Sequence, residues 1–503
     1  MASTTTALAE GASAGGTESA TTAPPTTDDL DAVDSEPLFA EDPFGGIFAD
    51  YQASFDRSTD PFSSLDSFCQ EHPAAENRTA SMRGVSEDTI QLGHLRNALE
   101  ELAGIGFGVE VGNVAEMFEF MVQALNDCGG VRGRTVELAT ADSSPLAADT
   151  VASLTAACLE LTEDVESAFI MNSSGFQGSS VLCVTEEHET PLITTQGLPQ
   201  EFYDRSDGIL ITMDIPIATG LKNLVLKADA DGMLEGKTIG VVYPDTPGIP
   251  PDMIAGVSDV LVGLGYEVAV EDEIGCGGAT SCVDGVQDSV ARMKAAGVDA
   301  LFPGLNILSL PGYVSEMVTQ GYEPGDVQFF NSSLNSQNAD LVSSKVVAFG
   351  GEAAGELYNG TYIVDAANTG VHSTDGAFVP PINQLCMDTY EAQGGQAYDY
   401  FSTGGNTPRG MLTLICVQVR LMARIVYHAG DNPTLESVKA AIAGLGAIDT
   451  EHMVPGSING QKGVDDMVQD LRWTFPCEFG PDRAFDDKNT CVVPTGNYVP
   501  LVR

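Results

Sequence analysis

The chain has 503 residues and a formal net charge of −50, because 72 acidic residues stand against only 22 lysines and arginines. Such a negative field repels phosphate backbones and anionic lipid, which excludes nucleic-acid binding and a polybasic membrane patch as the main function. Hydrophobic residues make up 43% of the chain, so disorder throughout is excluded as well. A single core stops growing near ~250–300 residues, and the length therefore predicts about two to four structural units.

The first 83 residues differ in composition from the rest. Residues 1–36 are almost exclusively Ala, Thr, Ser, Gly, Pro, Asp and Glu. Such a composition buries too little apolar area to offset chain entropy, so we expect a disordered tether. Residues 37–83 form an acidic arm that carries these aromatics: Phe39, Phe44, Phe48, Tyr51, Phe55, Phe62 and Phe68. Two interpretations of this aromatic arm remain open, namely packing on the main body and binding to a partner.

After Gly84, short apolar runs alternate with segments of helical periodicity, a pattern typical of parallel βα units. The predicted strands are Thr89–Leu95, Thr135–Thr140, Ser167–Met171, Pro191–Thr194, Ile209–Met213, Thr238–Tyr243, Glu267–Glu271, Ala300–Phe302, Val327–Asn331 and Val346–Gly350. The predicted helices between them are Glu116–Asp127, Pro145–Leu161, Pro251–Leu264, Val286–Ala296 and Gly312–Thr319. Most of them end at a glycine, the residue that closes a helix in the left-handed conformation. The pattern predicts an α/β protein.

This number of strands is too large for one compact sheet, and we expect a first break after Met213. Beyond Gly350 the chain becomes rich in helix. The predicted helices there are Ile382–Gln393, Pro408–His428 and Leu435–Ala443. The most apolar stretch, Met411–Val426, is interrupted by Gln418, Arg420 and Arg424. We therefore expect no membrane span and a soluble chain.

Ten cysteines, none of them in a C-x-x-C pair, predict disulfides and an oxidising compartment. The first residues have neither a basic region nor an apolar core. We therefore expect that a signal peptide, with or without the acylated cysteine of a lipoprotein, was removed or left out. The sequence leaves the disulfide connectivity open. Proximity along the chain favours Cys276 with Cys282, Cys477 with Cys491, Cys158 with Cys183, Cys386 with Cys416, and Cys69 with Cys128.

Several catalytic and metal-binding patterns occur, but each lacks its structural context. Gly11-Ala-Ser13-Ala-Gly15 matches a nucleophile elbow but lies in the low-complexity tether. Gly236-Lys237-Thr238 resembles the end of a phosphate loop but precedes a strand, and Asp229-Ala-Asp231-Gly232 lacks two calcium ligands. The six histidines are never three or four residues apart. We therefore expect no metal, no cofactor and no enzymatic activity.

Polar, glycine-containing loops follow several predicted strands, which is where α/β proteins bind ligands. Asn172-Ser173-Ser174-Gly175 opens a helix after the third strand, so hydroxyls and free helix amides converge on one point. That point is a candidate anion or carboxylate site. Thr195-Gln196-Gly197 and Ser332-Ser333-Leu334-Asn335 follow two further strands. His94 ends the first strand, where it is either a ligand contact or a structural donor.

The order of these motifs resembles the type I periplasmic solute-binding proteins of the Leu/Ile/Val-binding kind. Gly84-Val-Ser-Glu-Asp-Thr-Ile-Gln-Leu-Gly93 is similar to the family's opening strand. Leu125-Asn-Asp-Cys-Gly-Gly-Val-Arg-Gly-Arg134 is similar to its glycine-rich helix stop. Gly240-Val-Val-Tyr243 resembles the strand that opens the second lobe, and Asp431-Asn-Pro-Thr-Leu-Glu-Ser-Val-Lys439 resembles the start of a late helix. The resemblance runs from about residue 84 to 440.

The resemblance implies two Rossmann-like lobes with parallel sheets, joined by three crossovers near Asp214, Gly351 and Asp449. Lobe 1 would comprise residues 84–213 and 351–448, and lobe 2 residues 214–350 and 449–503. A small molecule would bind in the cleft between them. The implied contacts, with an apolar wall and the end of the first strand included, are Ser173, Ser174, Gln196, Gly197, Leu198, Asn306, Ser332, Ser333, His94 and Phe107.

These features predict an extracytoplasmic solute-binding protein that closes its lobes on a small polar or amphipathic solute, amino acid or amide-like, for an ABC importer. Its partners would be that solute and the importer's membrane subunits, and the protein would be a monomer held at the membrane by an N-terminal lipid anchor. A sensor that signals to a partner protein is the alternative, motivated by the aromatic arm. A hydrolase is a third hypothesis, which Ser173 within hydrogen-bond reach of His94 would favour.

Overall fold

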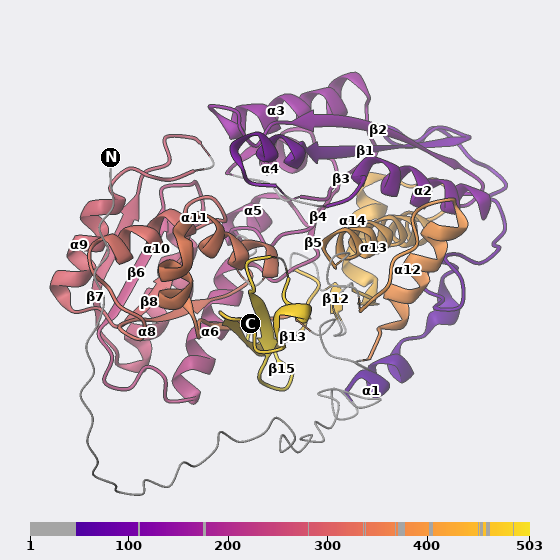
Figure 1. The fold of residues 1–503 in the computed structure, drawn as a ribbon. Coiled ribbons are helices and arrows are strands. Elements are labelled where there is room, and N and C mark those ends of the chain that lie inside the picture. Colours follow the sequence, from indigo (N-terminus) through magenta and orange to yellow (C-terminus); the bar gives the residue numbers. More distant parts are fainter. Residues whose placement is uncertain are drawn as a thin grey trace, which may run out of the picture.

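The structure of the protein is a computed structural model, which describes residues 47–108, 111–174, 178–279, 281–334, 337, 339–367, 369–370, 378–401, 406–450, 452, 456–458, 463–485 and 487–503. The expected tether, residues 1–36, and the first part of the aromatic arm, residues 37–46, lie outside these ranges. Two α/β units, each built on its own sheet, lie side by side in Figure 1. We call them lobe 1 and lobe 2.

Lobe 1 is built on a five-stranded parallel sheet with the order β2-β1-β3-β4-β5. Its strands are β1 (Thr89–Asn97), β2 (Thr135–Ser143), β3 (Phe169–Asn172), β4 (Leu192–Thr194) and β5 (Leu210–Thr212). Strands β3, β4 and β5 are buried along their whole length, as apolar runs covered on both faces of a parallel sheet are. Because all the strands are parallel, the loops after β1, β3 and β4 meet at one edge.

Helices and a core cluster cover each face of the lobe 1 sheet. The helices between its strands are η2 (Leu99–Ile105), α2 (Val114–Asp127), α3 (Thr150–Leu159), η3 (Glu160–Asp164), α4 (Ser180–Leu182), η4 (Cys183–Glu187) and α5 (Gln200–Arg205). Three more come from later in the chain: α12 (Pro381–Ala392), α13 (Asn406–Ala429) and α14 (Leu435–Gly444). Their buried residues share one core with β1 and α2, so two separate stretches of chain build lobe 1.

Lobe 2 is built on a sheet with the order β14-β13-β10-β9-β8-β6-β7, and β15 pairs with β13. Its strands are β6 (Ile239–Pro244), β7 (Val268–Ile274), β8 (Ala300–Pro303), β9 (Gln328–Asn331), β10 (Tyr362–Asp365), β13 (Met467–Thr474), β14 (Cys491–Pro494) and β15 (Val499–Pro500). Its helices are α6 (Ile217–Ala230), α7 (Ile249–Met253), η5 (Ile254–Ser258), α8 (Asp259–Leu264), α9 (Val286–Ala296), α10 (Leu310–Thr319), α11 (Asp340–Tyr358) and η8 (Pro481–Arg483). Strands β6 to β10 are parallel, and the C-terminal strands extend the sheet in the antiparallel sense.

The run Val346–Gly350, predicted as a strand, lies inside α11. The run is short and apolar, but Val342 and Val346 are both buried one helical turn apart, whereas Phe349 is 47% exposed. That distribution of buried and exposed residues is helical, and a window of five residues is too short to reveal it. The predicted lobe boundary at Gly351 is wrong for a related reason. This glycine has φ 80° and ψ 177° and kinks α11, with no change of lobe.

The chain crosses between the lobes three times. The first crossing follows β5, at Asp214. The second follows β10, so residues 351–365 belong to lobe 2 and not, as predicted, to lobe 1. The third leaves α14 and passes through a two-stranded ladder of β11 (Gly446–Ile448) and β12 (Gly456–Ile458) before it reaches β13.

The described part of the aromatic arm packs on lobe 1 and on the third crossing. It contains α1 (Ile47–Ser54) and η1 (Arg57–Thr59). Its buried aromatics are Phe55, Phe62 and Phe68. Tyr51 donates a 2.7 Å hydrogen bond to the carbonyl oxygen of Ile448, and Arg57 donates two bonds of 2.7 Å to the carboxylate of Asp449. Of the two interpretations of the arm, packing on the main body therefore applies to its described residues.

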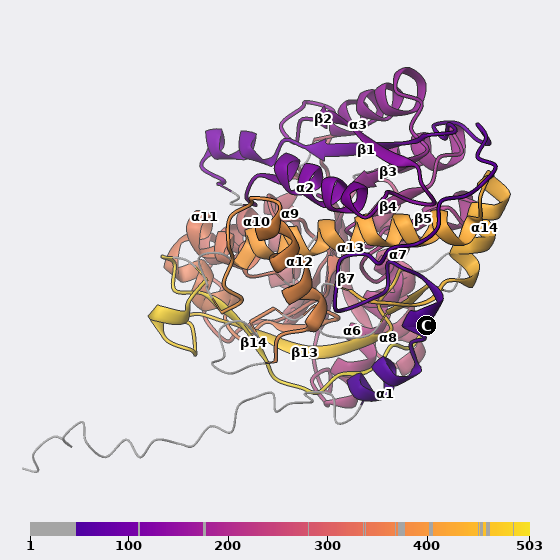
Figure 2. The same ribbon diagram turned by 90° about the vertical axis from the view of Figure 1, so that its right-hand side faces the viewer.

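Helix α13 contains a stretch, Pro408–Ala429, that is long and apolar enough to cross a membrane by length and composition. Within the structure, however, 83% of its most apolar window is buried, and Figure 2 shows the helix crossing beneath the strands of lobe 1. The aromatic arm supplies partners for the arginines that interrupt the apolar stretch of α13. Arg424 forms a 2.8 Å ion pair with Asp60, and Arg420 donates to the carbonyl oxygen of Ser64. Helix α13 is a core helix of lobe 1.

Five disulfides cross-link the structure, and they join the same pairs that proximity along the chain favoured. The bonds are Cys69–Cys128, Cys158–Cys183, Cys276–Cys282, Cys386–Cys416 and Cys477–Cys491. The first ties the aromatic arm to the end of α2. The second joins the helices on either side of β3, so it holds the loop after that strand between two anchored helices.

Candidate functional site

A cavity of about 390 Å³ lies at the edge of lobe 1 where β1 and β3 end. The carboxyl ends of parallel strands leave backbone groups unpaired and face helix N-termini, which is why ligands bind at such edges. The first turn of α2 lines one side. The polar and charged residues of the lining are Arg96, Asn97, Glu100, Asn113, Ser173 and Ser174, and smaller or apolar ones include Gly108 and Val114. Ser173 and Ser174 of the predicted serine loop therefore line a cavity.

Ser173, directly after β3, is hydrogen-bonded to His94 on β1, with 3.2 Å between Oγ and Nε2. The His94 ring is fully buried and stacks on Phe118 of α2, with 3.9 Å between ring centroids. Burial, and to a smaller extent the charge of Arg96, lowers the pKa of His94 to about 3. His94 is therefore a neutral imidazole at ordinary pH, held beneath the cavity floor.

This serine–histidine contact is the geometry that would favour the hydrolase hypothesis, provided that His94 could act as a general base. A general base works best with a pKa near the working pH, and in a catalytic triad a carboxylate orients its second nitrogen. The pKa of His94 is far too low, and its Nδ1 is buried with no hydrogen-bond partner in the described structure. The pair therefore lacks both properties of an activated nucleophile, and it favours binding over hydrolysis.

Ser174 is tied to the end of β1 by Asn97, which sequence reasoning missed. The backbone N–H of Asn97 donates to Ser174 Oγ at 3.3 Å, and its side-chain amide donates to the Ser174 carbonyl oxygen at 3.2 Å. Beside it, Arg96 donates two 2.8 Å hydrogen bonds to Asp142 and one to Glu100. The guanidinium charge is therefore neutralised by carboxylates at the rim of the cavity. Asn97 is the last residue of β1, and its place at the end of a strand could have marked it.

The loop after β4, predicted to contact the ligand, is held tightly against the first crossing. A Cβ placed on Gly197 would lie 1.8 Å from the carbonyl oxygen of Ile215, so only glycine fits there. Leu198, predicted as an apolar wall of the cleft, is 3% exposed and belongs to the lobe 1 core. Gln196 is half-buried. None of these three residues lines the cavity beside Ser173.

The predicted contacts in lobe 2 mainly order their own loops. Asn306 Oδ1 accepts hydrogen bonds from the backbone of Leu308 at 3.1 Å and of Ser309 at 3.0 Å, just before α10 begins. Ser332 Oγ accepts from the Leu334 N–H at 3.2 Å, inside the same turn. Ser333 is buried against α6. A ligand role for these residues stays a prediction.

The two lobes touch on both sides of the lobe 1 edge. Phe107 stacks on Phe349 of α11 with 5.1 Å between ring centroids, and Lys345 donates a 3.0 Å hydrogen bond to the carbonyl oxygen of Gly108. At the other side, the N–H of Thr150 donates to Gly278, in the loop closed by the Cys276–Cys282 disulfide, at 3.3 Å. Phe107 is thus an interlobe contact, and the structure represents an arrangement in which the lobes meet.

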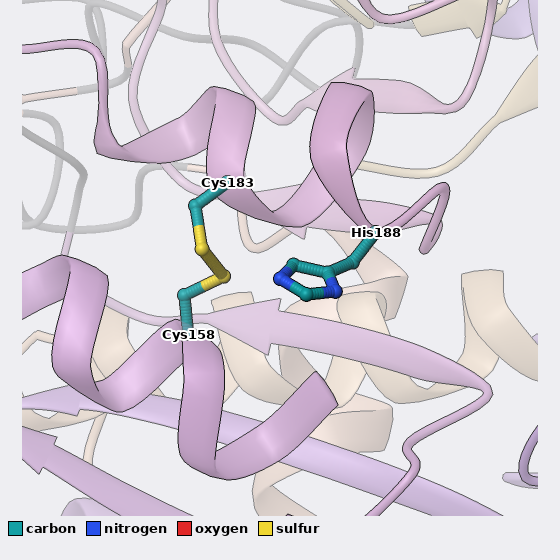
Figure 3. Close-up of side chains that lie close together, drawn as sticks. All are labelled: Cys158, Cys183 and His188. Atoms are coloured by element: carbon teal, nitrogen blue, oxygen red, sulfur yellow. A yellow bond between two sulfur atoms is a disulfide. The ribbon is translucent and has the colours of Figure 1, made fainter. Parts of the chain in front are cut away.

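One group of side chains in the described part of the chain has the spacing of a metal site: Cys158, Cys183 and His188. Figure 3 shows the two cysteines joined as a disulfide, with the imidazole of His188 beside the sulfur atoms. A disulfide sulfur is not a thiolate, and the thiolate is the form that binds metals. The group is therefore a cross-link with a neighbouring histidine, and it does not offer a metal site.

The sequence matches the model of a known protein family. The family model described as "Periplasmic binding protein" matches residues 112–471, which is more than half of the chain. The chain belongs to the periplasmic binding protein family. Membership implies an extracytoplasmic location and a role in binding small molecules. No curated protein matches the chain.

Solved structures of other periplasmic binding proteins share the fold at low sequence identity. A solute-binding protein of an ABC transporter from R. palustris, in complex with 4-hydroxybenzoate, aligns with a TM-score of 0.57 at 14% identity and covers 82% of this chain and 97% of its own. A fatty acid transporter substrate-binding protein from Thermomonospora curvata gives 0.57 at 15%, covering 85% and 96%. A branched-chain amino acid transporter substrate-binding protein from Streptococcus pneumoniae, in complex with isoleucine, gives 0.52 at 12%, covering 81% and 100%. These similarities confirm the predicted α/β fold.

Proposed function

We propose that this periplasmic binding protein captures a small polar or amphipathic solute by lobe closure and delivers it to an ABC importer. The observation that carries the proposal is the cavity at the ends of β1 and β3, which Ser173, Ser174 and the first turn of α2 line and where Lys345 of lobe 2 bonds to Gly108 of the lining. Closure is favoured by a solute that both lobes contact, because such a solute binds the closed form more tightly than the open one.

The interlobe contacts support a route by which a bound solute would favour closure. Lys345 and Phe349 lie on α11 of lobe 2, and both reach the segment Phe107–Gly108, which borders the cavity. A solute in the cavity and the contacts of α11 therefore act on the same segment of lobe 1. Binding that orders this segment lowers the entropic cost of bringing α11 onto it, which couples occupancy to closure.

The narrower identity of the solute is also part of the proposal. The Leu/Ile/Val-binding kind of protein binds amino acids, and structural neighbours were solved with isoleucine and with hydroxybenzoates. These ligands share a carboxylate, and we propose a carboxylate-bearing or amide-like solute on that basis. Attachment to the membrane through an N-terminal lipid anchor and a monomeric state complete the proposal. The sensor alternative loses its motivation at Phe55, Phe62 and Phe68 of the arm, which are buried.

Thermal unfolding with a panel of solutes tests the binding proposal. The panel contains L-isoleucine, 4-hydroxybenzoate, decanoate, acetamide and, as a cationic control, spermidine. A solute present at about 100 times its dissociation constant stabilises the folded protein by about 2.7 kcal/mol, which raises the unfolding temperature measurably. The Ser173→Ala variant should lose about half of that stabilisation. Ser315→Ala, a helix serine whose Oγ makes no hydrogen bond within the described ranges, should keep it. No shift with any member of the panel would contradict the proposal.

A further inference from the structure

The hydrogen bond between His94 and Ser173 can run in two directions, and the direction decides what Ser173 offers to a solute. A neutral imidazole carries one N–H and one bare nitrogen, and a hydroxyl can donate one hydrogen bond and accept two. If His94 Nε2 is bare, it consumes the Ser173 proton. If Nε2 carries the proton, it donates to Ser173 Oγ and the hydroxyl proton is left for another acceptor.

The surroundings of the second ring nitrogen distinguish the two cases. Nδ1 of His94 is buried and has no hydrogen-bond partner in the described structure. A proton on Nδ1 would therefore be a buried donor without an acceptor, and orphaned N–H groups are rarer in protein interiors than under-satisfied acceptors. With the proton on Nε2, the only donor of the ring is satisfied at 3.2 Å by Ser173 Oγ.

We propose that His94 is a positioning residue that donates from Nε2 to Ser173 Oγ, so that Ser173 presents its own proton to the cavity. Ser174 is set in the same way, because its Oγ already accepts from the backbone N–H of Asn97. Two adjacent hydroxyls, each with an acceptor lone pair occupied by the protein, then face the cavity as donors. The group of the solute that binds here is an oxygen acceptor.

One further feature supports an anionic acceptor over a neutral one. The first turn of α2, a helix of 14 residues, lines the same cavity at Asn113 and Val114, and its dipole favours negative charge there. Arg96 at the rim is paired with Asp142 and Glu100, so its charge contributes little to this preference. The inference rests on the proposed function for the identity of this cavity as the solute site, and it names a carboxylate as the group bound.

Burial keeps the His94 ring neutral, so the direction of its hydrogen bond to Ser173 does not depend on pH. Because burial lowers the pKa of His94 to about 3, the ring stays neutral throughout the range in which the protein is handled. Phe118 packs against the ring, with 3.9 Å between ring centroids and 31° between ring planes, while Nε2 is hydrogen-bonded to Ser173.

The tautomer of His94 is measured directly by long-range ¹H–¹⁵N correlation on the whole protein labelled with ¹⁵N-histidine, and the spectrum of His94→Gln assigns the signal. We expect a proton on Nε2 and a bare Nδ1. The opposite tautomer would overturn the inference. This measurement needs no solute, so it remains decisive even if the proposed function fails.

Binding supplies the second test, with 4-hydroxybenzoate as the acidic probe, 4-hydroxybenzyl alcohol as the neutral one and 4-hydroxybenzylamine as the cationic one. Wild type should bind the acid most tightly. His94→Leu removes the donor and should weaken that binding about tenfold, whereas His94→Gln keeps an N–H donor and should stay within about threefold. The double variant His94→Leu/Ser173→Ala should bind no worse than Ser173→Ala, because the two residues act as one unit.

Three results of this binding test would overturn the inference: tighter binding of the amine than of the acid, equal loss in the Gln and Leu variants, and additive losses in the double variant. If none of the three probes binds while Nε2 carries the proton, the donor role of His94 stands and the hydroxybenzoate-like solute of the proposed function is wrong.

Discussion

The chain contains the same tripeptide twice, Asn172-Ser173-Ser174 after β3 in lobe 1 and Asn331-Ser332-Ser333 after β9 in lobe 2. In lobe 1 the serine hydroxyls are hydrogen-bonded to β1, a different strand, and they border a cavity. In lobe 2 the first serine accepts from the backbone two residues later in its own turn. The same Asn-Ser-Ser tripeptide, at equivalent places in the two sheets, therefore makes different contacts in each lobe.

The difference comes from what the rest of each lobe places beside the tripeptide. Asn172 is bound on both ends of its amide, to the Leu95 carbonyl oxygen and the Thr194 hydroxyl, each at 3.0 Å. Asn331 donates to the Tyr358 hydroxyl, and its Oδ1 is buried with no partner in the described structure. The lobe 1 tripeptide is thus anchored across three strands, which leaves its serines with fixed directions. The tripeptide predicts a loop at the end of a strand, but the residues that surround it determine the role of its serines.

The largest expected effect comes from removing the cross-link around the lobe 1 tripeptide. Cys158 and Cys183 are 25 residues apart and flank β3, so replacing both by Ala should lower the free energy of unfolding by about 3 to 4 kcal/mol. The matched variant in lobe 2, with Cys276 and Cys282 replaced, opens a loop of only 6 residues and should cost about 2 kcal/mol. Urea unfolding measures both, and a larger loss in the lobe 2 variant would contradict the loop-entropy argument.

The second largest effect is expected at the two asparagines, which should contribute differently to the free energy of unfolding. Asn172→Ala leaves a buried hydroxyl and a carbonyl oxygen short of partners, and it should destabilise the protein by about 2 to 3 kcal/mol. Asn331→Ala removes one hydrogen bond and should cost about 1 kcal/mol. Equal losses in thermal unfolding would show that the anchoring of the two tripeptides does not differ.

The stability of lobe 1 should depend on pH through His94, which has no counterpart beside the lobe 2 tripeptide among the residues that the structure describes. The folded pKa of about 3 lies below the ordinary value of 6.5, so the unfolded chain binds more protons between these values and stability falls as pH falls through that window. Between pH 7.5 and pH 5 the loss should be about 2 kcal/mol greater in the wild type than in His94→Gln. The comparison of both proteins by chemical denaturation at the two pH values checks this, and parallel losses would mean that burial does not hold His94 neutral.

The smallest expected effect is on affinity. Ser173→Ala should weaken binding of a carboxylate solute about tenfold, equivalent to about 1.4 kcal/mol, because one donor to a charged group is lost. Ser332→Ala should change the affinity by less than about twofold while lowering the free energy of unfolding by about 1 kcal/mol, since its hydroxyl serves its own turn. Isothermal titration and thermal unfolding of both variants separate the two roles, and a reversed pattern would place the solute on the lobe 2 loop.

Part of the site could be predicted from the sequence. Short apolar runs followed by polar residues located the strand ends and therefore the loop of Ser173 and Ser174, because strand periodicity is a local property. Leu198 shows where such reasoning fails: it follows a strand end in the same way, yet it packs into the lobe 1 core beside Phe202 and Tyr203. Asn97 was missed because its role depends on a loop 77 residues later.

The sequence by itself determined the α/β class, the positions of strands β1 to β9 along the chain and the acidic character of the chain, since periodicity, glycine stops and composition act over short distances. Only the tertiary structure decided that Val346–Gly350 is helical, that the aromatic arm supplies partners to the arginines of α13, and that one serine loop faces a cavity. Those outcomes depend on groups far apart in the chain, as His94 and Ser173 are, with 79 residues between them. Such pairs meet only when the sheet forms, because the order of its strands brings them together.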